Sequence, residues 1–458
     1  MYQIPVIAIY DVGKTNKKFF LFDRQYQIVF QKTLVFPQKK DADGYECEDL
    51  AMVRDFLFRT LDEVFLSRQF LVKGINFSTY GASLVHVDQD GEPVADMLNY
   101  LKPYPAEVLE DFLQLVAAKK SFELETSCPL QGNLNTGLQL FLLKKQRWDL
   151  WDKIAYSLHF PQYLSSLLTH SYRSEITTIG CHTCLWDFKN RNWHEWTIRF
   201  GIKSKLPEID TAQNLYNITY NQAKLAVGTG MHDSSAALVP YLKCIKVPFI
   251  LLSTGTWSVA LNPFDKEPLT ERQLRQGCLS YLTYQGQPVK SSKFFLGDIY
   301  RQEVERIARF FNTRVEKYNS LMFDRHFFWA SFAMESLPVM YSDVLPDIAG
   351  FSGKDLTRYD SDMDAYYTLV VELLKMQYYY IAIIDAKNEI QDLYVDGGFS
   401  KNEVFMQSMA FVFKNHRIYA AKVSQSTALG AAMVLQDNCK DKPVQPPELI
   451  ETKRYFPG

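Results

Sequence analysis

Residues 9–18, IYDVGKTNKK, decide how the rest of the chain is interpreted. The tripeptide Gly-Lys-Thr at positions 13–15 matches the end of a phosphate-binding P-loop, whose backbone N–H groups and following helix cradle nucleotide phosphates. Ala8 stands where that motif needs its first glycine, and the apolar run Phe19–Phe22 follows where the helix would begin. The stretch is therefore not a P-loop.

The same stretch predicts a β-hairpin. Val6–Tyr10 has the apolar pattern of a buried strand, Asp11–Asn16 contains turn-forming residues, and Lys17–Phe22 has the pattern of a returning antiparallel strand. Asp11 would then stand at a strand end, beside exposed N–H groups of the turn. An ordinary hairpin turn that contains an aspartate is the alternative interpretation.

The composition is that of a folded globular protein. Of the 458 residues, 47% are hydrophobic and 22% charged, and the formal net charge is −2. This length predicts two or three domains. Scattered cations and a charge near zero disfavour binding to nucleic acid. No apolar run in the sequence approaches the roughly 18 residues of a membrane span, so we expect no membrane partner.

The number and spacing of the cysteines indicate the redox state of the compartment in which the protein works. Seven cysteines without regular spacing suit a reducing cytoplasm better than a disulfide framework, so we expect a cytoplasmic protein. Cys181 and Cys184 have the C-x-x-C spacing of zinc and redox sites, but a four-ligand zinc site needs a second pair, which the sequence lacks. We interpret them as buried or incidental cysteines, with a metal or redox role as the alternative.

The outline of the first hairpin recurs about half a chain length later. Val247–Leu252 is an apolar run, Ser253–Thr256 interrupts it with glycine and hydroxyl residues, and Trp257–Leu261 resumes it. This repeat predicts two homologous lobes.

A third glycine-containing turn stands near the C-terminus. Leu393–Val395 predicts a short strand, and Asp396-Gly397-Gly398 predicts a turn through which the backbone can approach a flat ligand. Ser400 and Glu403 have the spacing of a capping box, which predicts the start of a helix.

Together these stretches resemble the FGGY family of carbohydrate kinases, most closely its rhamnulokinases and then its fuculokinases, in the superfamily that also contains actin and hexokinase. The motifs that carry the resemblance, in chain order, are DVGKTNKK (11–18), GMHDSSAALVP (230–240), LLSTGTWSVALNP (251–263), DGGFSKN (396–402) and STALGAA (426–432). The resemblance implies an α/β fold of two duplicated actin-like (ribonuclease H-like) lobes, residues 1–238 and 239–458, with an active-site cleft between them.

The resemblance also implies an ATP- and Mg²⁺-dependent enzyme. It would transfer the γ-phosphate of ATP to a primary hydroxyl of a ketose such as L-rhamnulose or L-fuculose, so the expected partner is a small sugar, and a homodimer is compatible with it. A binding protein that responds to sugar or nucleotide without catalysis is the alternative, and an actin-like or chaperone ATPase is a third.

The resemblance assigns roles to individual residues. Asp233 would be the general base, and Asp11 would hold Mg²⁺ directly or through water. The implied nucleotide and phosphate contacts are Asp11, Gly13, Thr15, Asn16, Lys18, Gly255, Thr256, Gly397, Gly398 and Asn402. The implied sugar contacts are Gly81, Ala82, His232 and Asp233. For Asp233 a helix N-cap is the structural alternative, and for His232 a packed or surface histidine.

The sequence departs from the family pattern at several positions. Lys14 replaces a small residue, and it would either contact a phosphate or point to solvent. Ala82 and Ser83 stand where relatives carry an acidic residue, Tyr284 and Gln285 replace an amide and a carboxylate, and His182 replaces a small polar residue. Because polar recognition sets specificity, these changes leave the identity of the sugar open.

Overall fold

The computed structural model describes residues 3–37, 39–116, 119–333, 351–423, 425–438 and 449–457. Its contacts divide the chain into two compact units. Unit 1 contains 1–244, 280–288 and 424–449, and unit 2 contains 245–279, 289–423 and 450–458. Unit 1 thus includes two segments from the second half of the chain, which a division into contiguous ranges does not anticipate. The expected boundary at Leu238 stays a prediction.

Unit 1 is built on a mixed sheet with the strand order β13-β14-β6-β1-β2-β3, and β15 pairs with β6. The strands are β1 (Ile4–Val12), β2 (Asn16–Phe22), β3 (Ile28–Val35), β6 (Phe70–Thr79), β13 (Leu215–Tyr220), β14 (Ala223–Gly228) and β15 (Met231–His232). β1 and β2 are antiparallel, with Tyr10 opposite Phe19. The predicted first hairpin is therefore confirmed.

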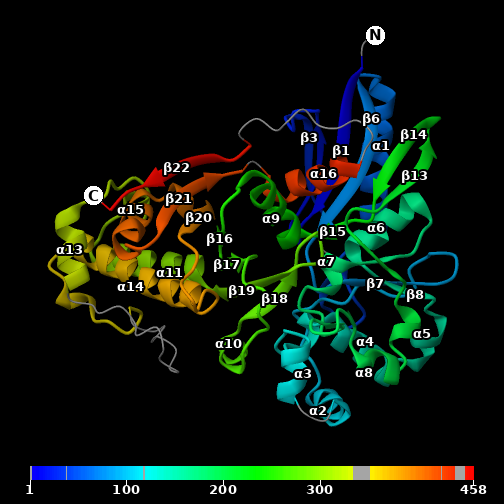
Figure 1. The fold of residues 1–458 in the computed structure, drawn as a ribbon, viewed down its shortest axis with the longest axis horizontal. Coiled ribbons are helices and arrows are strands. Elements are labelled where there is room, and N and C mark those ends of the chain that lie inside the picture. Colours follow the sequence, from blue (N-terminus) through cyan, green and yellow to red (C-terminus); the bar gives the residue numbers. More distant parts are fainter. Residues whose placement is uncertain are drawn as a thin grey trace. The chain divides into compact units, whose positions relative to one another are not determined.

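The two faces of this sheet meet different helices. On one face, alternate residues of β1 such as Ala8 and Tyr10 pack against α1 (Leu50–Ser67) and α6 (Phe160–Thr169) in one apolar core. On the other face lies α16 (Ser426–Asn438), whose Ala431 carbonyl accepts a hydrogen bond from Asn76 of β6. α16 also packs against α9 (Asp233–Cys244). A segment from the far end of the sequence thus completes unit 1 (Figure 1).

A second core in unit 1 lies among the helices and short strands between β6 and β13, where Phe112, Phe141 and Trp196 pack together. The elements of this region are β7 (Leu84–Val87), α2 (Ala106–Leu115), α3 (Lys119–Glu125), α4 (Thr136–Gln146), α5 (Trp148–Lys153), β8 (Tyr156–His159), β9 (Ser174–Glu175), α7 (Ile176–Ile179), β10 (Trp186–Asp187), β11 (Asn192–Trp193), α8 (Glu195–Arg199) and β12 (Ile209–Asp210). The pair β4 (Lys39–Lys40) and β5 (Glu46–Cys47) precedes α1.

Unit 2 contains most of the sheet β18-β19-β17-β16-β20-β21-β22; residues 280–282 of β18 and the first residue of β19, Pro288, belong to unit 1. Its strands are β16 (Phe249–Thr254), β17 (Ser258–Asn262), β18 (Leu279–Leu282), β19 (Pro288–Phe294), β20 (Asp392–Gly397), β21 (Arg417–Lys422) and β22 (Glu451–Tyr455). Its helices are α10 (Glu271–Arg275), α11 (Leu296–Phe310), α12 (Glu316–Asn319), α13 (Arg325–Ala333), α14 (Asp362–Ala382) and α15 (Glu403–Val412). β16 and β17 are antiparallel, which confirms the second predicted hairpin.

The predicted capping box before α15 is wrong. Asn402 is the N-cap residue, and its side chain accepts a hydrogen bond from the Phe405 N–H at 2.9 Å. Ser400 instead donates its hydroxyl hydrogen to the Gly397 carbonyl, and Glu403, the first residue of α15, accepts a hydrogen bond from Tyr455. An asparagine caps a helix as well as a serine does, so the spacing alone did not decide between them.

Within the described ranges, no helix has both the length and the apolar character needed to cross a membrane.

Candidate active site

The parallel strands β1, β6 and β15 place the first group of expected site residues at one edge of the unit 1 sheet. Asp11 of β1 pairs with Ser78 of β6, and His232 of β15 pairs with the next residue of β6, Thr79. Asp233 follows His232 directly and begins α9. The carboxyl ends of these strands therefore bring Asp11 and the His232-Asp233 pair to the same region.

Asp11 also points to the face of the sheet on which α16 packs. Side chains alternate along a strand, and Val12 belongs to the core on the opposite face. Burial raises the pKa of the Asp11 carboxyl to about 6, with the nearby Lys18 opposing this rise and the nearby Asp233 adding to it. Lys18 lies directly opposite Asp11 in the β1–β2 pair. Asp11 is thus a carboxylate in a poorly solvated place, with one cation and a second carboxylate as neighbours.

The turn after Asp11 is held by hydrogen bonds on its inner side. The Gly13 N–H donates to the Asn16 carbonyl at 2.9 Å. Lys17 is buried and donates from Nζ to the carbonyls of Gly13 and Lys14, at 2.9 and 3.0 Å. Thr15 and Asn16 are exposed at the tip. The carbonyls of Gly13, Lys14 and Asn16 are thereby occupied, while the tip at Thr15 and Asn16 is exposed.

Lys14 does not simply point to solvent, and its contact with a phosphate stays a prediction. Its ammonium lies 4.7 Å from the ring centre of Tyr100 and 5.8 Å from that of Tyr80, and it contacts Asn99. Partial burial lowers the pKa of Lys14. The side chain is therefore packed against two tyrosine rings.

The side chain of Asp233 is oriented through one of its two oxygens. Oδ1 accepts hydrogen bonds from the Ser234 N–H at 2.6 Å and the Ser234 hydroxyl at 3.2 Å. His232 Nε2 lies 3.2 Å from the same oxygen. The side chain is 37% exposed, yet the surrounding protein atoms desolvate the carboxyl and raise the pKa of Asp233 to about 6. Near neutral pH the group is therefore a carboxylate that can accept a proton.

His232 is a packed histidine at the centre of a polar and aromatic cluster. The Tyr281 ring stacks on its imidazole with the ring centres 5.7 Å apart, and Cys181 Sγ lies 3.0 Å from Nε2. Burial lowers the pKa of His232 to about 3, so its ring is neutral. The packed alternative describes His232 correctly, and the sugar-contact role stays a prediction.

Gly81 and Ala82 differ in what they present to this cluster. A Cβ on Gly81 would meet His232 Nε2 at 3.0 Å and His182 Nε2 at 3.1 Å, so the glycine lies against both rings. Ala82 has a positive φ of 57°, and its carbonyl accepts a hydrogen bond from Gln139 at 2.8 Å. Gly81 therefore adjoins the cluster directly, whereas the Ala82 carbonyl is used in a structural contact.

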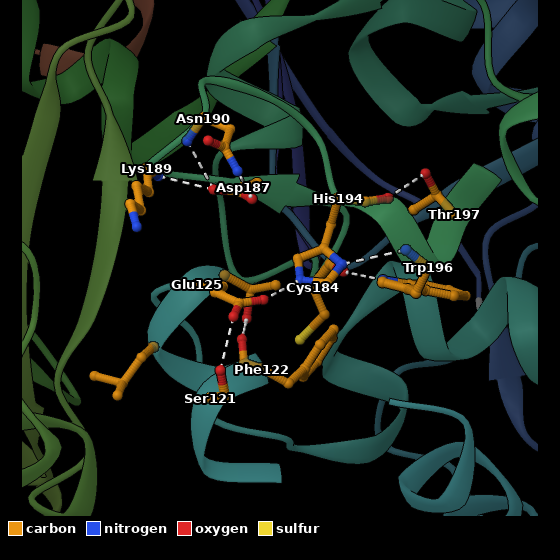
Figure 2. A network of polar contacts seen from close by, with 12 residues as sticks. Ser121, Phe122, Glu125, Cys184, Asp187, Lys189, Asn190, His194, Trp196 and Thr197 are labelled. Atoms are coloured by element: carbon orange, nitrogen blue, oxygen red, sulfur yellow. Dashed lines mark hydrogen bonds and ion pairs between the residues drawn. The ribbon is translucent and has the colours of Figure 1, made fainter. Parts of the chain in front are cut away.

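The loop that carries Cys181 and His182 is held by hydrogen bonds from Trp196 and Asn135. The Trp196 indole N–H donates to the Cys184 carbonyl at 2.8 Å, and the Asn135 amide donates to the His182 carbonyl at 2.9 Å. Figure 2 shows the Trp196 contact beside His194, whose Nε2 lies 2.8 Å from Glu125 Oε2. These contacts give Cys181 and His182 a defined position.

Unit 2 brings its two glycine-containing turns together. β16 and β20 are parallel neighbours with Thr254 opposite Gly397, and the Gly398 N–H donates to the Thr254 carbonyl at 2.9 Å. Gly397 has a φ of +91°, and a Cβ there would overlap the Thr254 carbonyl. Gly255 and Thr256 follow Thr254, so four of the five expected nucleotide residues of unit 2 lie in adjoining turns.

Asn402, the remaining expected nucleotide residue, is engaged by the protein itself. Besides capping α15, it lies with its amide nitrogen 3.2 Å from the Tyr300 hydroxyl and 3.3 Å from the Tyr366 hydroxyl. A role for Asn402 at the nucleoside stays a prediction.

Several residues of this region were not expected from the sequence. Tyr281 and Lys17 have no distinguishing neighbours in the chain. The C-x-x-C spacing was the one signal available for Cys181, but it pointed to Cys184 as the partner, and the structure instead brings His182 and His232 beside it.

Comparison with known protein families gives two matches. The domain described as the N-terminal domain of the FGGY family of carbohydrate kinases matches residues 6–239. The C-terminal domain of carbohydrate kinase FGGY matches residues 246–443.

Curated relatives are similar over part of the chain. A rhamnulokinase of Halalkalibacterium halodurans is 26% identical over 199 residues, which are 40% of this chain and 40% of the relative. An L-fuculokinase of Escherichia coli is 22% identical over 279 residues, 56% of each chain. The chain thus spans about half the length of these relatives.

Solved structures match almost the whole fold. A carbohydrate kinase from Novosphingobium aromaticivorans has a TM-score of 0.79 at 21% identity, covering 98% of this chain and 96% of that chain. A ligand-bound xylulose kinase from Lactobacillus acidophilus has a TM-score of 0.76 at 15% identity, covering 99% and 94%. At these identities the likeness concerns the fold.

Proposed function

Because this chain belongs to the FGGY family of carbohydrate kinases, we propose that it transfers the γ-phosphate of ATP to a primary hydroxyl of a ketose. The observation that carries the proposal is the setting of Asp233, whose contacts with Ser234 and His232 converge on Oδ1. Oδ2 is then the oxygen that accepts a proton, and Asp11 lies near enough to influence the charge of the same region.

Asp233 acts as the general base in this proposal. Its Oδ2 takes the proton of the sugar hydroxyl as the hydroxyl oxygen forms a bond to the γ-phosphorus and ADP departs. A pKa of about 6 suits this task, because the carboxylate is largely ionised near neutral pH and yet is more basic than an ordinary aspartate. Ser234 and His232 orient the base by holding its other oxygen.

Asp11 fits the role of a magnesium ligand. Mg²⁺ prefers oxygen ligands and in such sites uses one or two carboxylates together with waters and phosphate oxygens. Asp11 offers a carboxylate in a poorly solvated place beside Asp233, so an added cation there is electrostatically favourable. When bound, Mg²⁺ neutralises charge on the phosphates; the role of Asp11 is to hold it.

The phosphate and nucleoside contacts follow the family motifs. In unit 1 the exposed Thr15 and Asn16 offer polar groups to phosphate oxygens, and Lys18 adds positive charge. We assign Gly13 to the same phosphates through the close approach that its lack of a side chain permits. In unit 2 we assign the same function to Gly255 and Thr256. Gly397, Gly398 and Asn402 are assigned to the nucleoside.

The names of the relatives support a 6-deoxyketohexose substrate, L-rhamnulose or L-fuculose. The residues around Asp233 suit a sugar through neutral groups. Tyr281 and the neutral His232 offer ring surface and hydrogen bonds, and Gly81 leaves room beside both histidines.

The test is ADP release from Mg²⁺-ATP by the full chain, measured across a panel of ketoses, aldoses and polyols. The proposal expects release that depends on one ketose, with L-rhamnulose and L-fuculose as first candidates. Stimulation by a polyol alone would overturn the substrate class. ATP binding seen as a thermal shift, with no ADP release on any sugar, would favour a binding protein without catalysis.

A further inference from the structure

Three metal-ligating side chains meet beside the proposed base. Cys181 Sγ, a ring nitrogen of His182 and one of His232 all lie within 4.8 Å of one another. We propose that these residues form a binding site for a divalent metal cation of borderline softness, with Zn²⁺ as the natural candidate.

The chemistry of the ligands selects the class of metal. Zn²⁺ is bound in proteins by thiolate and imidazole ligands, whereas Mg²⁺ prefers oxygen. One sulfur and two ring nitrogens therefore make this a different site from the one proposed at Asp11. A site with three protein ligands leaves a fourth position for water or for another group. Asp233 Oδ1, 3.2 Å from His232 Nε2, is near enough to serve as that group.

His182 is oriented as metal-binding histidines usually are. Its Nδ1 lies 2.9 Å from the Leu134 carbonyl oxygen. A carbonyl oxygen only accepts hydrogen bonds, so Nδ1 carries a hydrogen, and in the neutral ring Nε2 carries the lone pair. This second contact fixes both the tautomer and the ring orientation of a metal-ligating histidine. The nitrogen with the lone pair faces Gly81, as does His232 Nε2.

Gly81 leaves the space between the two rings open. A Cβ at that position would meet both Nε2 atoms at 3.0–3.1 Å. The backbone of Gly81 has no positive φ, so its conformation does not require a glycine. The missing side chain instead leaves room beside the two histidine nitrogens.

The distances fit a bound ion after a small adjustment. Zn–S and Zn–N bonds of about 2.3 and 2.05 Å at a tetrahedral angle separate sulfur from nitrogen by roughly 3.6 Å. Cys181 Sγ and His232 Nε2 are 3.0 Å apart, so the two atoms must separate by roughly half an ångström. Binding breaks the S–H bond of Cys181 and forms a sulfur–metal bond, and the released proton passes to the buffer. The Nε2 hydrogen that His232 directs at Asp233 Oδ1 moves to Nδ1 of the same ring, so that Nε2 offers its lone pair to the cation. No oxidation state changes.

Occupation of this site has a consequence that rests on the proposed function. The cation would hold His232 and compete for Asp233, which are the residues assigned to the sugar and to proton transfer. Zn²⁺ would then inhibit sugar phosphorylation in competition with the sugar, and removal of Zn²⁺ by a chelator would restore it.

Co²⁺ is a spectroscopic probe for the site, because thiolate ligation produces a charge-transfer band in the near ultraviolet and tetrahedral Co²⁺ absorbs strongly in the visible. The full chain, freed of metal and kept reduced, is titrated with Co²⁺ alone. Wild type is expected to show both features at one equivalent, and Cys181→Ser is expected to lose the charge-transfer band. Absence of the band in wild type would overturn the proposal.

Cys184→Ser is the matched control. Cys184 belongs to the same C-x-x-C stretch and its thiol contacts Cys128, but within the described part of the chain it is not in the cluster. This variant is expected to keep the band. A band that survives Cys181→Ser and disappears in Cys184→Ser would place the metal at the Cys128–Cys184 pair and contradict the proposal.

Gly81→Ala tests the geometry without removing a ligand. Its methyl group would enter the space between the ring nitrogens, and Co²⁺ affinity is expected to fall by roughly ten- to a hundredfold, as when residues that orient metal ligands are changed. Unchanged affinity in a folded Gly81→Ala protein would contradict the site. The Co²⁺ titrations need no turnover, so they test the metal site even if the protein proves not to be a kinase. Inhibition by Zn²⁺ is measured once a sugar that the protein phosphorylates is known.

Discussion

Lys17 Nζ lies 2.9 Å from Glu48 Oε1, and the two side chains are only 2% and 9% exposed. The same ammonium group binds the carbonyls of Gly13 and Lys14, and Glu48 also accepts a hydrogen bond from Tyr80 at 2.9 Å. A buried ion pair therefore holds the turn that we assign to the phosphates. Lys17 is a positioning residue, because its ammonium group binds Glu48 and two backbone carbonyls of the turn and is not directed at a ligand.

Replacement of Lys17 tests this role. Lys17→Met leaves Glu48 buried without its cation and the turn carbonyls without a donor, which should cost about 3–5 kcal/mol of unfolding free energy. The looser turn should raise KM for ATP more than it lowers kcat. Chemical denaturation and steady-state kinetics measure the two effects.

The double variant Lys17→Met/Glu48→Gln is the control for the uncompensated charge. It removes both charges while the amide can still accept the Tyr80 hydrogen bond, so part of the lost stability should return. If Lys17→Met alone has the same free energy of unfolding as wild type, the ion pair does not hold the turn.

Gly397 and Gly398 provide a second test, because adjacent glycines face different constraints. A Cβ on Gly397 would overlap the Thr254 carbonyl at a φ of +91°, whereas a Cβ on Gly398 would lie 4.0 Å from that oxygen. Gly397→Ala should cost about 3 kcal/mol or more, since steric overlap and backbone strain each cost roughly 1–3 kcal/mol.

Gly398→Ala should keep the thermal stability of the fold and lose affinity for ATP if the nucleoside approaches this backbone. Thermal unfolding and ATP binding of both variants separate a structural glycine from a ligand-facing one. Equal stability of the two alanine variants would contradict the close contact at Thr254.

His86 predicts a pH dependence of stability. It is buried in β7, its Nδ1 lies 2.9 Å from the Ser157 hydroxyl, and burial lowers the pKa of His86 to about 4 from 6.5. Between these values the unfolded chain binds the proton and the folded protein does not. The contribution of neutral His86 to the free energy of unfolding is therefore fully present above pH 6.5. It is lost as the pH falls towards 4, at up to about 1.4 kcal/mol per pH unit.

His86→Gln removes this titration and keeps a group that can bind Ser157. Thermal unfolding midpoints between pH 4.5 and 7 should fall less steeply in the variant than in wild type. Some slope should remain, because burial also lowers the pKa of His159 to about 3. Identical slopes in the two proteins would show that His86 is not buried in its neutral form.

The sequence was a good guide where a feature depends on neighbours in the chain. The hairpin around Gly13 and its repeat around Gly255 were predictable, because alternating or continuous apolar runs and turn residues are local signals. The order of the motifs was also enough to indicate the family. The capping box before α15 failed because Asn402 and Ser400 are both good cap residues and lie close together.

Features that depend on distant residues were not predictable. Lys17 and Glu48 are 31 positions apart, and no local pattern distinguishes this lysine from Lys18. Tyr281 reaches His232 from a separate segment of unit 1. The return of 424–449 to unit 1 likewise depends on packing between α16 and β6, which a linear reading of apolar residues cannot locate.

In the proposed reaction Asp233 takes the proton of a sugar hydroxyl, and a comparison of wild type with Asp233→Asn tests this step most directly. ADP release from Mg²⁺-ATP is recorded with the ketose that wild type prefers, and ATP binding by thermal shift verifies that the variant is folded. We predict that kcat falls by at least about 100-fold while ATP binding persists, because the amide keeps the shape but cannot accept the proton. Sugar-dependent turnover at the wild-type rate in Asp233→Asn would contradict the role of Asp233 as the general base.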